Sequence, residues 1–140
     1  MQRITQAPEL PIRSYAHLGD SVYELFIREK TVRLTQNPKK MHMLTVALVN
    51  ARYQADLLEQ IKDFLSEKEA DMVRRARNLS VTTARRTDHK VHRLSTAFEV
   101  LVGYLYVHNK ERLQELYEVL NPIINTSLEQ FKLENSQENF

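Results

Sequence analysis

The 140-residue sequence contains no cysteine, only two glycines and only four prolines. Without cysteine the chain forms neither a disulfide nor a thiolate metal site, which fits a reducing compartment. Sheets with tight turns usually need more glycine and proline, so the composition favours an all-helical fold. No apolar run approaches the roughly 20 residues of a membrane span, and the first residues lack the apolar core of a secretory signal. We therefore expect a soluble protein of the cytoplasm, or of an organelle if a transit peptide has been removed.

The length suggests one domain with its own core, because a chain of about this size buries roughly two-thirds of its unfolded surface. We predict an irregular leader over residues 1–10, a single domain over 11–132 and a disordered tail over 133–140. Apolar residues recur at helical spacing through most of the domain. The predicted helices cover about 15–30, 40–65, 67–78, 89–108, 110–120 and a last segment from 122 onward.

Several short signals predict where these helices begin and end. Asn-Pro at 37–38 predicts a break before the second helix. Ser66 followed by Glu69 fits a capping box, in which the serine caps a backbone amide and the glutamate reaches back. Asn-Pro at 121–122 fits an N-cap followed by proline at the first helical position. The segment LSVTTARRTD, residues 79–88, has no helical period and predicts a loop.

The net charge of +2 hides an uneven distribution. Residues 74–93 hold seven basic residues and one acid, a net charge of +6, so the rest of the chain carries −4. The basic residues are Arg74, Arg75, Arg77, Arg85, Arg86, Lys90 and Arg93. A basic block on an otherwise acidic chain indicates a surface that faces a polyanion such as nucleic acid. The alternative is a solvated basic loop without a partner.

Each of the two glycines lies near an acid on a predicted helix: Gly19 precedes Asp20, and Gly103 follows Glu99 by one turn. A glycine inside a helix costs roughly 1 kcal/mol relative to alanine. A carboxylate among apolar neighbours is also costly unless it is paired, hydrogen-bonded or bound to a metal. We therefore predict that the two helices cross at the glycines and bring Asp20 and Glu99 into one partly buried acidic site.

Other interpretations of these side chains stay open. The two acids could pair with arginine, and Arg28 or Arg93 is available for this. His89 and His92 are three residues apart and could suggest a metal pair. We favour ordinary histidines without a metal, because the chain has no cysteine and Asp88 is the only acid nearby.

Two segments resemble the catalytic helices of ribonuclease III. HLGDSVYELFIR, residues 17–28, resembles the signature helix, and STAFEVLVGYLYV, residues 95–107, resembles the second catalytic helix. The connecting RRARNLSVTTARRTD and the short chain resemble Mini-ribonuclease III, the compact subfamily made of the catalytic domain alone. The resemblance covers about residues 11–120.

The resemblance implies an all-helical homodimer with the signature helix in its interface. Such a protein is an endoribonuclease that cuts double-stranded RNA and leaves 5′-phosphate and 3′-hydroxyl ends. It uses a divalent cation, which is magnesium, with manganese as the alternative. The subfamily is associated with maturation of the large-subunit (23S) ribosomal RNA precursor. Because we see no separate domain for double-stranded RNA, we expect a helper such as a ribosomal protein to select the substrate.

The resemblance also assigns roles to individual residues. Asp20 and Glu99 match the two motif acids, which bind metal and act in catalysis. Ala16 and Thr96 stand where full-length relatives carry two further acids, and the compact subfamily also lacks these acids. Water and the Thr96 hydroxyl could then complete the coordination from outside. The seven basic residues of the 74–93 segment are the candidates for binding RNA.

Two alternative functions remain beside the nuclease. The chain could be a catalytically weak RNA-binding module that acts in ribosome assembly. It could also be a helical interaction protein whose acids form salt bridges.

Overall fold

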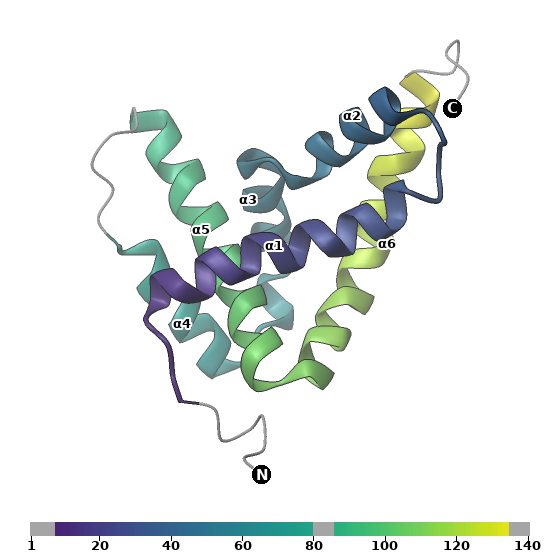
Figure 1. Ribbon diagram of the computed structural model, residues 1–140. Helices are drawn as coiled ribbons and strands as arrows, with labels where there is room; N and C mark the ends of the chain where they lie inside the picture. The colour runs from purple at the N-terminus through teal and green to yellow at the C-terminus, as the bar shows by residue number, and fades with distance from the viewer. Residues whose placement is uncertain (1–7, 80–85, 135–140) are drawn as a thin grey trace.

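The computed structural model describes residues 8–79 and 86–134. These ranges form helices joined by short connections and contain no strand, which confirms the predicted all-α fold (Figure 1). The elements are α1 (Ile12–Thr31), α2 (Pro38–Val49), α3 (Ala51–Gln60), the 3-10 turn η2 (Lys62–Phe64), α4 (Glu67–Arg77), α5 (Arg86–His108) and α6 (Lys110–Glu134). None of the described helices has the length and apolar character that crossing a bilayer would require.

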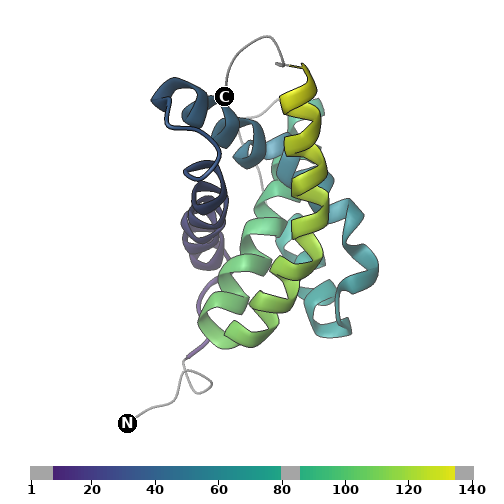
Figure 2. The ribbon, with the colours of Figure 1, turned by 90° about the vertical axis from the view of Figure 1, so that its right-hand side faces the viewer.

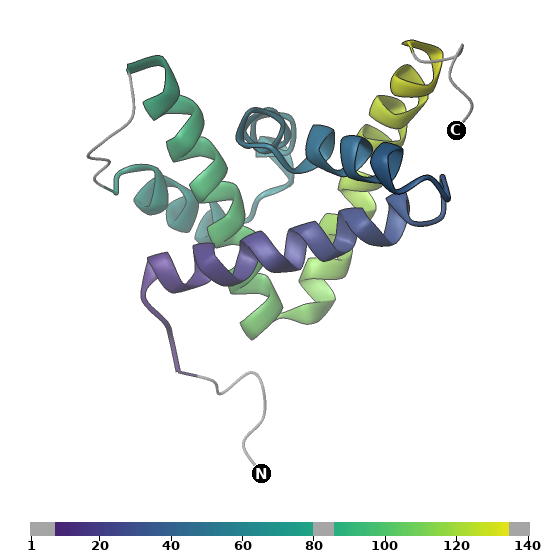
Figure 3. The ribbon, with the colours of Figure 1, turned by 45° about the horizontal axis from the view of Figure 1, so that its top comes forward.

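Helix α5 is the centre of the fold, because α1, α3 and α4 all pack against it. Its residues from Ala97 to Val102 include five that are fully buried. Helix α1 crosses α5, and α6 turns back at the end of α5 and diverges from it (Figure 1). A view turned by 90° places α1 and α2 on one side and α4 on the other (Figure 2). With the top brought forward, α1 again passes across α5, so the crossing is no effect of projection (Figure 3).

The helix starts follow the local chemistry of the sequence. The Asn37 side chain accepts hydrogen bonds from the two backbone amides at residues 39 and 40, with Pro38 at the first helical position of α2. Ser66 and Glu69 form both hydrogen bonds of the predicted capping box at the start of α4. Both satisfy backbone N–H groups that a helix start otherwise leaves without a partner.

Glu69 also links α4 to α6. Its carboxylate accepts hydrogen bonds from Nε and Nη2 of Arg112, both at 2.9 Å. Arg112 Nη2 donates as well to the backbone oxygen of Phe64, at 2.8 Å. The Glu69 side chain is 8% exposed, and such a buried carboxylate is stable only with a partner of opposite charge.

The prediction of one helix over 40–65 is wrong, because the chain turns at Asn50 between α2 and α3. The Asn50 amide nitrogen donates to the backbone oxygens of Val46 and Ala47, and its Oδ1 accepts from the backbone N–H of Tyr53. One side chain thus ends α2 and begins α3. The apolar spacing could not reveal this turn, because both helices bury their apolar residues in the same core.

The predicted break at 121–122 is also wrong, since α6 continues through Pro122 to Glu134. Proline inside a helix loses one backbone hydrogen bond. The buried stripe of Leu120 and Ile124 continues across it, however, and holds the helix against the core. Asn121 is no cap, and its Oδ1 accepts a hydrogen bond from Lys30 Nζ at 2.5 Å instead.

The remaining boundaries differ little from the predicted ones. Helix α5 begins at Arg86, three residues earlier than the sequence suggested. Most of the predicted loop, residues 80–85, lies outside the described residues, as do residues 1–7 of the leader and 135–140 of the tail.

Candidate functional site

Helices α1 and α5 touch backbone to backbone at the two glycines. A Cβ atom on Gly19 would lie 1.8 Å from the backbone oxygen of Glu99, and one on Gly103 would lie 2.0 Å from that of Tyr15. Neither glycine has a positive φ, so close approach alone requires the missing side chain. The predicted crossing at Gly19 and Gly103 is therefore confirmed.

The crossing brings the two acids together. The pKa of the Glu99 carboxyl is raised to about 8, first by burial and then by the charge of Asp20 and a hydrogen bond with it. Asp20 is exposed and Glu99 is half-buried, so the pair lies at the surface end of the crossing. Two carboxyl groups in contact share a proton when no positive charge lies between them.

No arginine pairs with these acids in the described part of the chain. Arg28 forms its ion pair with Glu24 instead, at 2.7 Å. Arg93 forms no ion pair with any residue whose side chain the structure describes. In the described part of the chain, Asp20 and Glu99 therefore do not form salt bridges with Arg28 or Arg93.

A third polar side chain, Gln54 of α3, reaches Glu99 and was missed from the sequence. It is 2% exposed, and its Nε2 donates to the backbone oxygen of Val49 at 2.9 Å. A hydrogen bond from the Gln54 side chain to Glu99 opposes the rise in the pKa of that carboxyl. The signal for Gln54 was available, because it lies one turn before Leu58, on the apolar stripe of its helix.

These groups fit a divalent cation. Carboxylate oxygens are the ligands that hard cations such as Mg²⁺ prefer, and a cation would remove the repulsion between Asp20 and Glu99. Within ranges 8–79 and 86–134, no group of three or more Asp, Glu, His or Cys residues is placed to hold a metal. The site therefore offers two carboxylates, with Ala16 and Thr96 half-buried on the same two helices.

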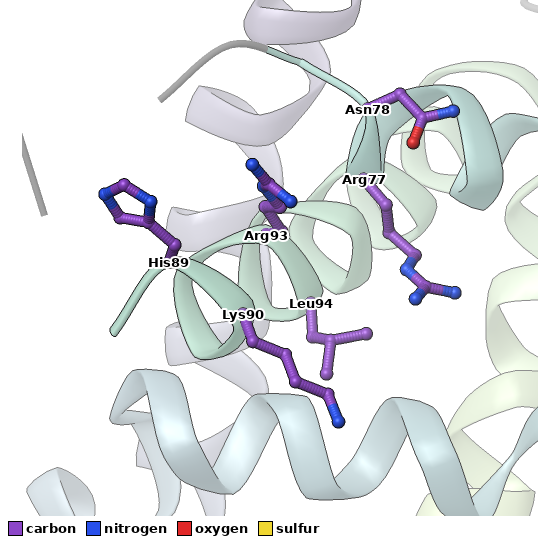
Figure 4. A pocket seen from close by; sticks show the side chains of 6 residues that line it. All are labelled: Arg77, Asn78, His89, Lys90, Arg93 and Leu94. Carbon is purple, nitrogen blue, oxygen red and sulfur yellow. The ribbon is translucent and has the colours of Figure 1, made fainter. Parts of the chain in front are cut away.

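Three of the basic residues gather around a cavity of about 430 Å³ between the end of α4 and the start of α5 (Figure 4). The described residues that line it are Arg77, Asn78, His89, Lys90, Arg93 and Leu94. In Figure 4 the His89 ring points away from the Arg77 guanidinium. None of the three basic side chains forms an ion pair with another described residue. The cavity therefore presents positive charge that is available to an anion.

The other candidates for RNA binding differ from these three. Arg74 and Arg75 both pair with Asp71, the latter at 3.3 Å, which neutralises part of their charge. Arg85 lies outside the described residues, and the position of the Arg86 side chain is likewise not described.

The two histidines do not form a metal site with the described acids. His89 Nε2 is buried and has no hydrogen-bond partner among the described residues. His92 is exposed. The preference for ordinary histidines stays a prediction.

Comparison with known proteins identifies the family. Residues 13–110 match the family model described as Ribonuclease III domain, which covers well over half of the chain. The chain belongs to the ribonuclease III family. This membership makes it an endoribonuclease, in a family that acts on double-stranded RNA and depends on divalent metal ions.

Relatives of similar size are named Mini-ribonuclease 3. The protein of Thermosynechococcus vestitus is 37% identical over 123 residues, which cover 88% of this chain and 82% of the relative. That of Thermoanaerobacter sp. (strain X514) is 42% identical over 112 residues, or 78% of this chain and 79% of the relative. The resemblance to the compact subfamily is therefore confirmed.

A solved structure supports the fold as well. The crystal structure of protein FN1578 from Fusobacterium nucleatum superimposes with a TM-score of 0.74 at 28% sequence identity. The match covers 85% of this chain and 95% of the other. The helical arrangement described above is thus the ribonuclease III domain fold.

Proposed function

We propose that the protein cleaves double-stranded RNA by metal-assisted hydrolysis, with Asp20 and Glu99 as its catalytic and metal-binding residues. The observation that carries this proposal is the contact of two carboxyl groups from different helices, held by a glycine crossing, with no described arginine to neutralise them. Magnesium suits these oxygen ligands, and manganese is the alternative. The expected products carry 5′-phosphate and 3′-hydroxyl ends.

Each acid has a distinct part in this proposal. When bound, the cation would polarise the scissile phosphate and lower the pKa of a water molecule. Asp20 is exposed and offers its carboxylate at the surface, where a phosphate of the RNA can approach. Glu99 is half-buried and anchors the site to the central helix α5. Glu99 must release its proton to bind metal, because metal ligands act in their deprotonated form.

The position of the basic cavity supports binding of RNA beside the acids. Lys90 and Arg93 precede Glu99 on the same helix by nine and six residues, which is about 14 and 9 Å along the axis. A-form RNA is recognised mostly through its shape and phosphates, since its major groove is too narrow to read. We propose that Arg77, Lys90 and Arg93 hold phosphates most firmly. Arg74 and Arg75 would add a weaker contribution because both pair with Asp71, and Arg85 and Arg86 stay candidates without a rank.

Salt dependence tests this ranking. Replacing Arg77 or Arg93 by alanine should reduce the slope of log affinity against log salt concentration by about 1 for each phosphate that the protein no longer neutralises. Arg74→Ala is the matched control, because Arg74 already shares Asp71, and it should change the slope less. Equal slopes for all three variants and the wild type would contradict the assignment.

We also propose a homodimer formed through α1 and α2. Leu18 and Leu25 of α1 and its C-cap residue Val32 follow one another every seven residues, and the last two are 61% and 57% exposed. Met43 and Val46 of the adjacent α2 are also exposed large hydrophobic residues. An apolar stripe of this kind usually marks a protein interface. A two-fold dimer would place one acid pair for each RNA strand.

The physiological substrate follows from the subfamily. We propose that the protein acts in the cytoplasm on the large-subunit ribosomal RNA precursor, with a ribosomal protein as helper. This proposal rests on the resemblance to the compact subfamily, to which the relatives named Mini-ribonuclease 3 point.

Cleavage of double-stranded RNA with Mg²⁺ tests the central proposal. We expect the wild type to cut, and Asp20→Asn to bind RNA without cutting it. Glu24→Gln is the matched control, because it removes a carboxylate one turn away that is paired with Arg28, and it should retain activity. A wild type that binds without cutting would favour the RNA-binding module, and one that does neither would favour the interaction protein.

A further inference from the structure

The Gln54 amide is held in one orientation by the end of α2. Val49 is the last residue of α2, so its carbonyl has no partner within that helix. Gln54 Nε2 donates to this oxygen at 2.9 Å. The opposite amide orientation would place two oxygens against each other, so the nitrogen must face Val49.

The Gln54 side chain also reaches the acid pair. A glutamine amide has two donor hydrogens, and the Gln54 side chain also hydrogen-bonds to the Glu99 carboxyl. Helix α3 packs against α5, as α1 does, and this packing brings the amide to Glu99. Glu99 therefore contacts both Asp20 on α1 and Gln54 on α3.

Stability alone does not account for a glutamine here. Gln54 Oε1 is buried and has no hydrogen-bond partner among the described residues. A buried acceptor without a partner costs about 1–3 kcal/mol, and an apolar side chain of similar size would avoid this cost. The stripe on which Gln54 lies is otherwise apolar, with Ala55, Leu57 and Leu58 buried around it. A polar residue kept at such a cost indicates a role in the site.

We propose that Gln54 is a positioning residue, whose amide orients the Glu99 carboxylate so that it can bind the divalent cation with Asp20. This inference rests on the proposed metal-dependent function. Gln54 lies in neither of the two motif segments, and it acts through Glu99. Its removal should therefore weaken metal binding more than it weakens the fold.

The test compares two variants that each lose one buried hydrogen bond at the end of α2. Gln54→Met removes the amide at nearly constant volume. Tyr23→Phe is the matched control, because the fully buried Tyr23 hydroxyl donates to the neighbouring carbonyl of Leu48 at 2.6 Å. Both variants lose a hydrogen bond to a backbone oxygen at the end of α2, and only Gln54→Met also loses the hydrogen bond to Glu99.

Metal binding is measured by the rise in Tm with Mn²⁺ in the absence of RNA, and by the Mg²⁺ concentration for half-maximal cleavage. Loss of a residue that orients a metal ligand typically costs 10- to 100-fold in metal affinity or activity. We expect Gln54→Met to raise the Mn²⁺ concentration at the midpoint of the Tm rise, and the Mg²⁺ concentration for half-maximal cleavage, by at least 10-fold. Tyr23→Phe should lower the metal-free Tm and leave both of these midpoint concentrations unchanged. Unchanged midpoints in Gln54→Met, or equal shifts in both variants, would overturn the inference.

A measurement on the wild type covers the case in which Gln54→Met does not fold. The side-chain amide resonances of Gln54 should shift during a Mg²⁺ titration with the same midpoint as the Glu99 carboxyl carbon. An amide that stays unchanged while the Glu99 carboxyl responds would overturn the inference. If the wild type binds metal through these groups but does not cut RNA, the proposed nuclease function fails and the role of Gln54 stands.

Discussion

Replacement of Gly103 by alanine should destabilise the protein, although alanine is the better helix former. The new Cβ would lie 2.0 Å from the Tyr15 backbone oxygen and 2.8 Å from its carbonyl carbon. Ordinary contact begins at 3.4 Å, so α1 and α5 must separate by about 1.4 Å. Backbone atoms cannot rotate away as a side chain can.

Two opposing terms set the size of this effect. Overpacking a tight contact costs about 1–3 kcal/mol, and a rigid backbone contact belongs at the upper end. Alanine recovers about 1 kcal/mol through helix propensity. The net loss is therefore about 2 kcal/mol, which lowers Tm by roughly 6 °C in a domain of this size. Separation of the helices also moves Asp20 away from Glu99, and a displacement of about 1 Å can cost roughly 100-fold in rate.

Thermal unfolding followed by circular dichroism measures the first effect, and single-turnover cleavage well below Tm measures the second. Ser21→Ala is the control, because Ser21 is exposed on α1 and reports the gain in helix propensity alone. A Gly103→Ala protein as stable as the wild type would refute the close approach of the two helices. Full activity in a destabilised variant would refute its importance for the acid pair.

Arg112→Met should lower the free energy of unfolding in urea by about 3 kcal/mol, because it leaves the buried Glu69 carboxylate without its partner. In metal-free protein, stability should fall as pH rises from 4.5 to about 8, the usual and the folded pKa of Glu99. The folded state binds this proton more tightly than the unfolded state, so ionisation favours unfolding over that interval. Leu25→Glu should convert the dimer to a folded monomer in light scattering, because Leu25 is 61% exposed on the proposed interface.

A specific result would contradict each of these expectations. Lys62→Met breaks the exposed ion pair with Glu59 and should lower the free energy of unfolding by less than about 1 kcal/mol. If Arg112→Met lowers it by the same amount, the buried ion pair stabilises the protein no more than an exposed one. A flat stability curve between pH 4.5 and 8 would contradict the raised pKa of Glu99. Asp20→Asn should make the curve less steep without flattening it, because burial is the larger cause of the raised pKa. A wild-type monomer, or a dimer that persists in Leu25→Glu, would refute the proposed interface.

The sequence was most informative where the chemistry is local or where two rare features coincide. The capping box at Ser66 and Glu69 was readable because both partners lie within one helical turn. The crossing was readable because the chain has only two glycines and each lies near an acid. The family motifs around Asp20 and Glu99 then named the fold and the enzyme class.

Other features depended on contacts between distant segments. Asn50 ends one helix and begins the next, yet the apolar spacing passes through it because both helices face one core. Pro122 stays inside α6 because burial of its neighbours outweighs one lost hydrogen bond. In both cases tertiary packing decided between local alternatives that the sequence left equal.

The site shows the same division. Its two carboxylates, their glycines and the nearby positive charge were all present in the sequence, because residue type and spacing along a helix carry that information. Only the folded chain decided that Gln54 reaches Glu99 from α3, and that Asp71 neutralises Arg74 and Arg75 while Arg77 has no ion-pair partner among the described residues. A single sequence does not specify such pairings, because they arise where helices separated along the chain meet in space.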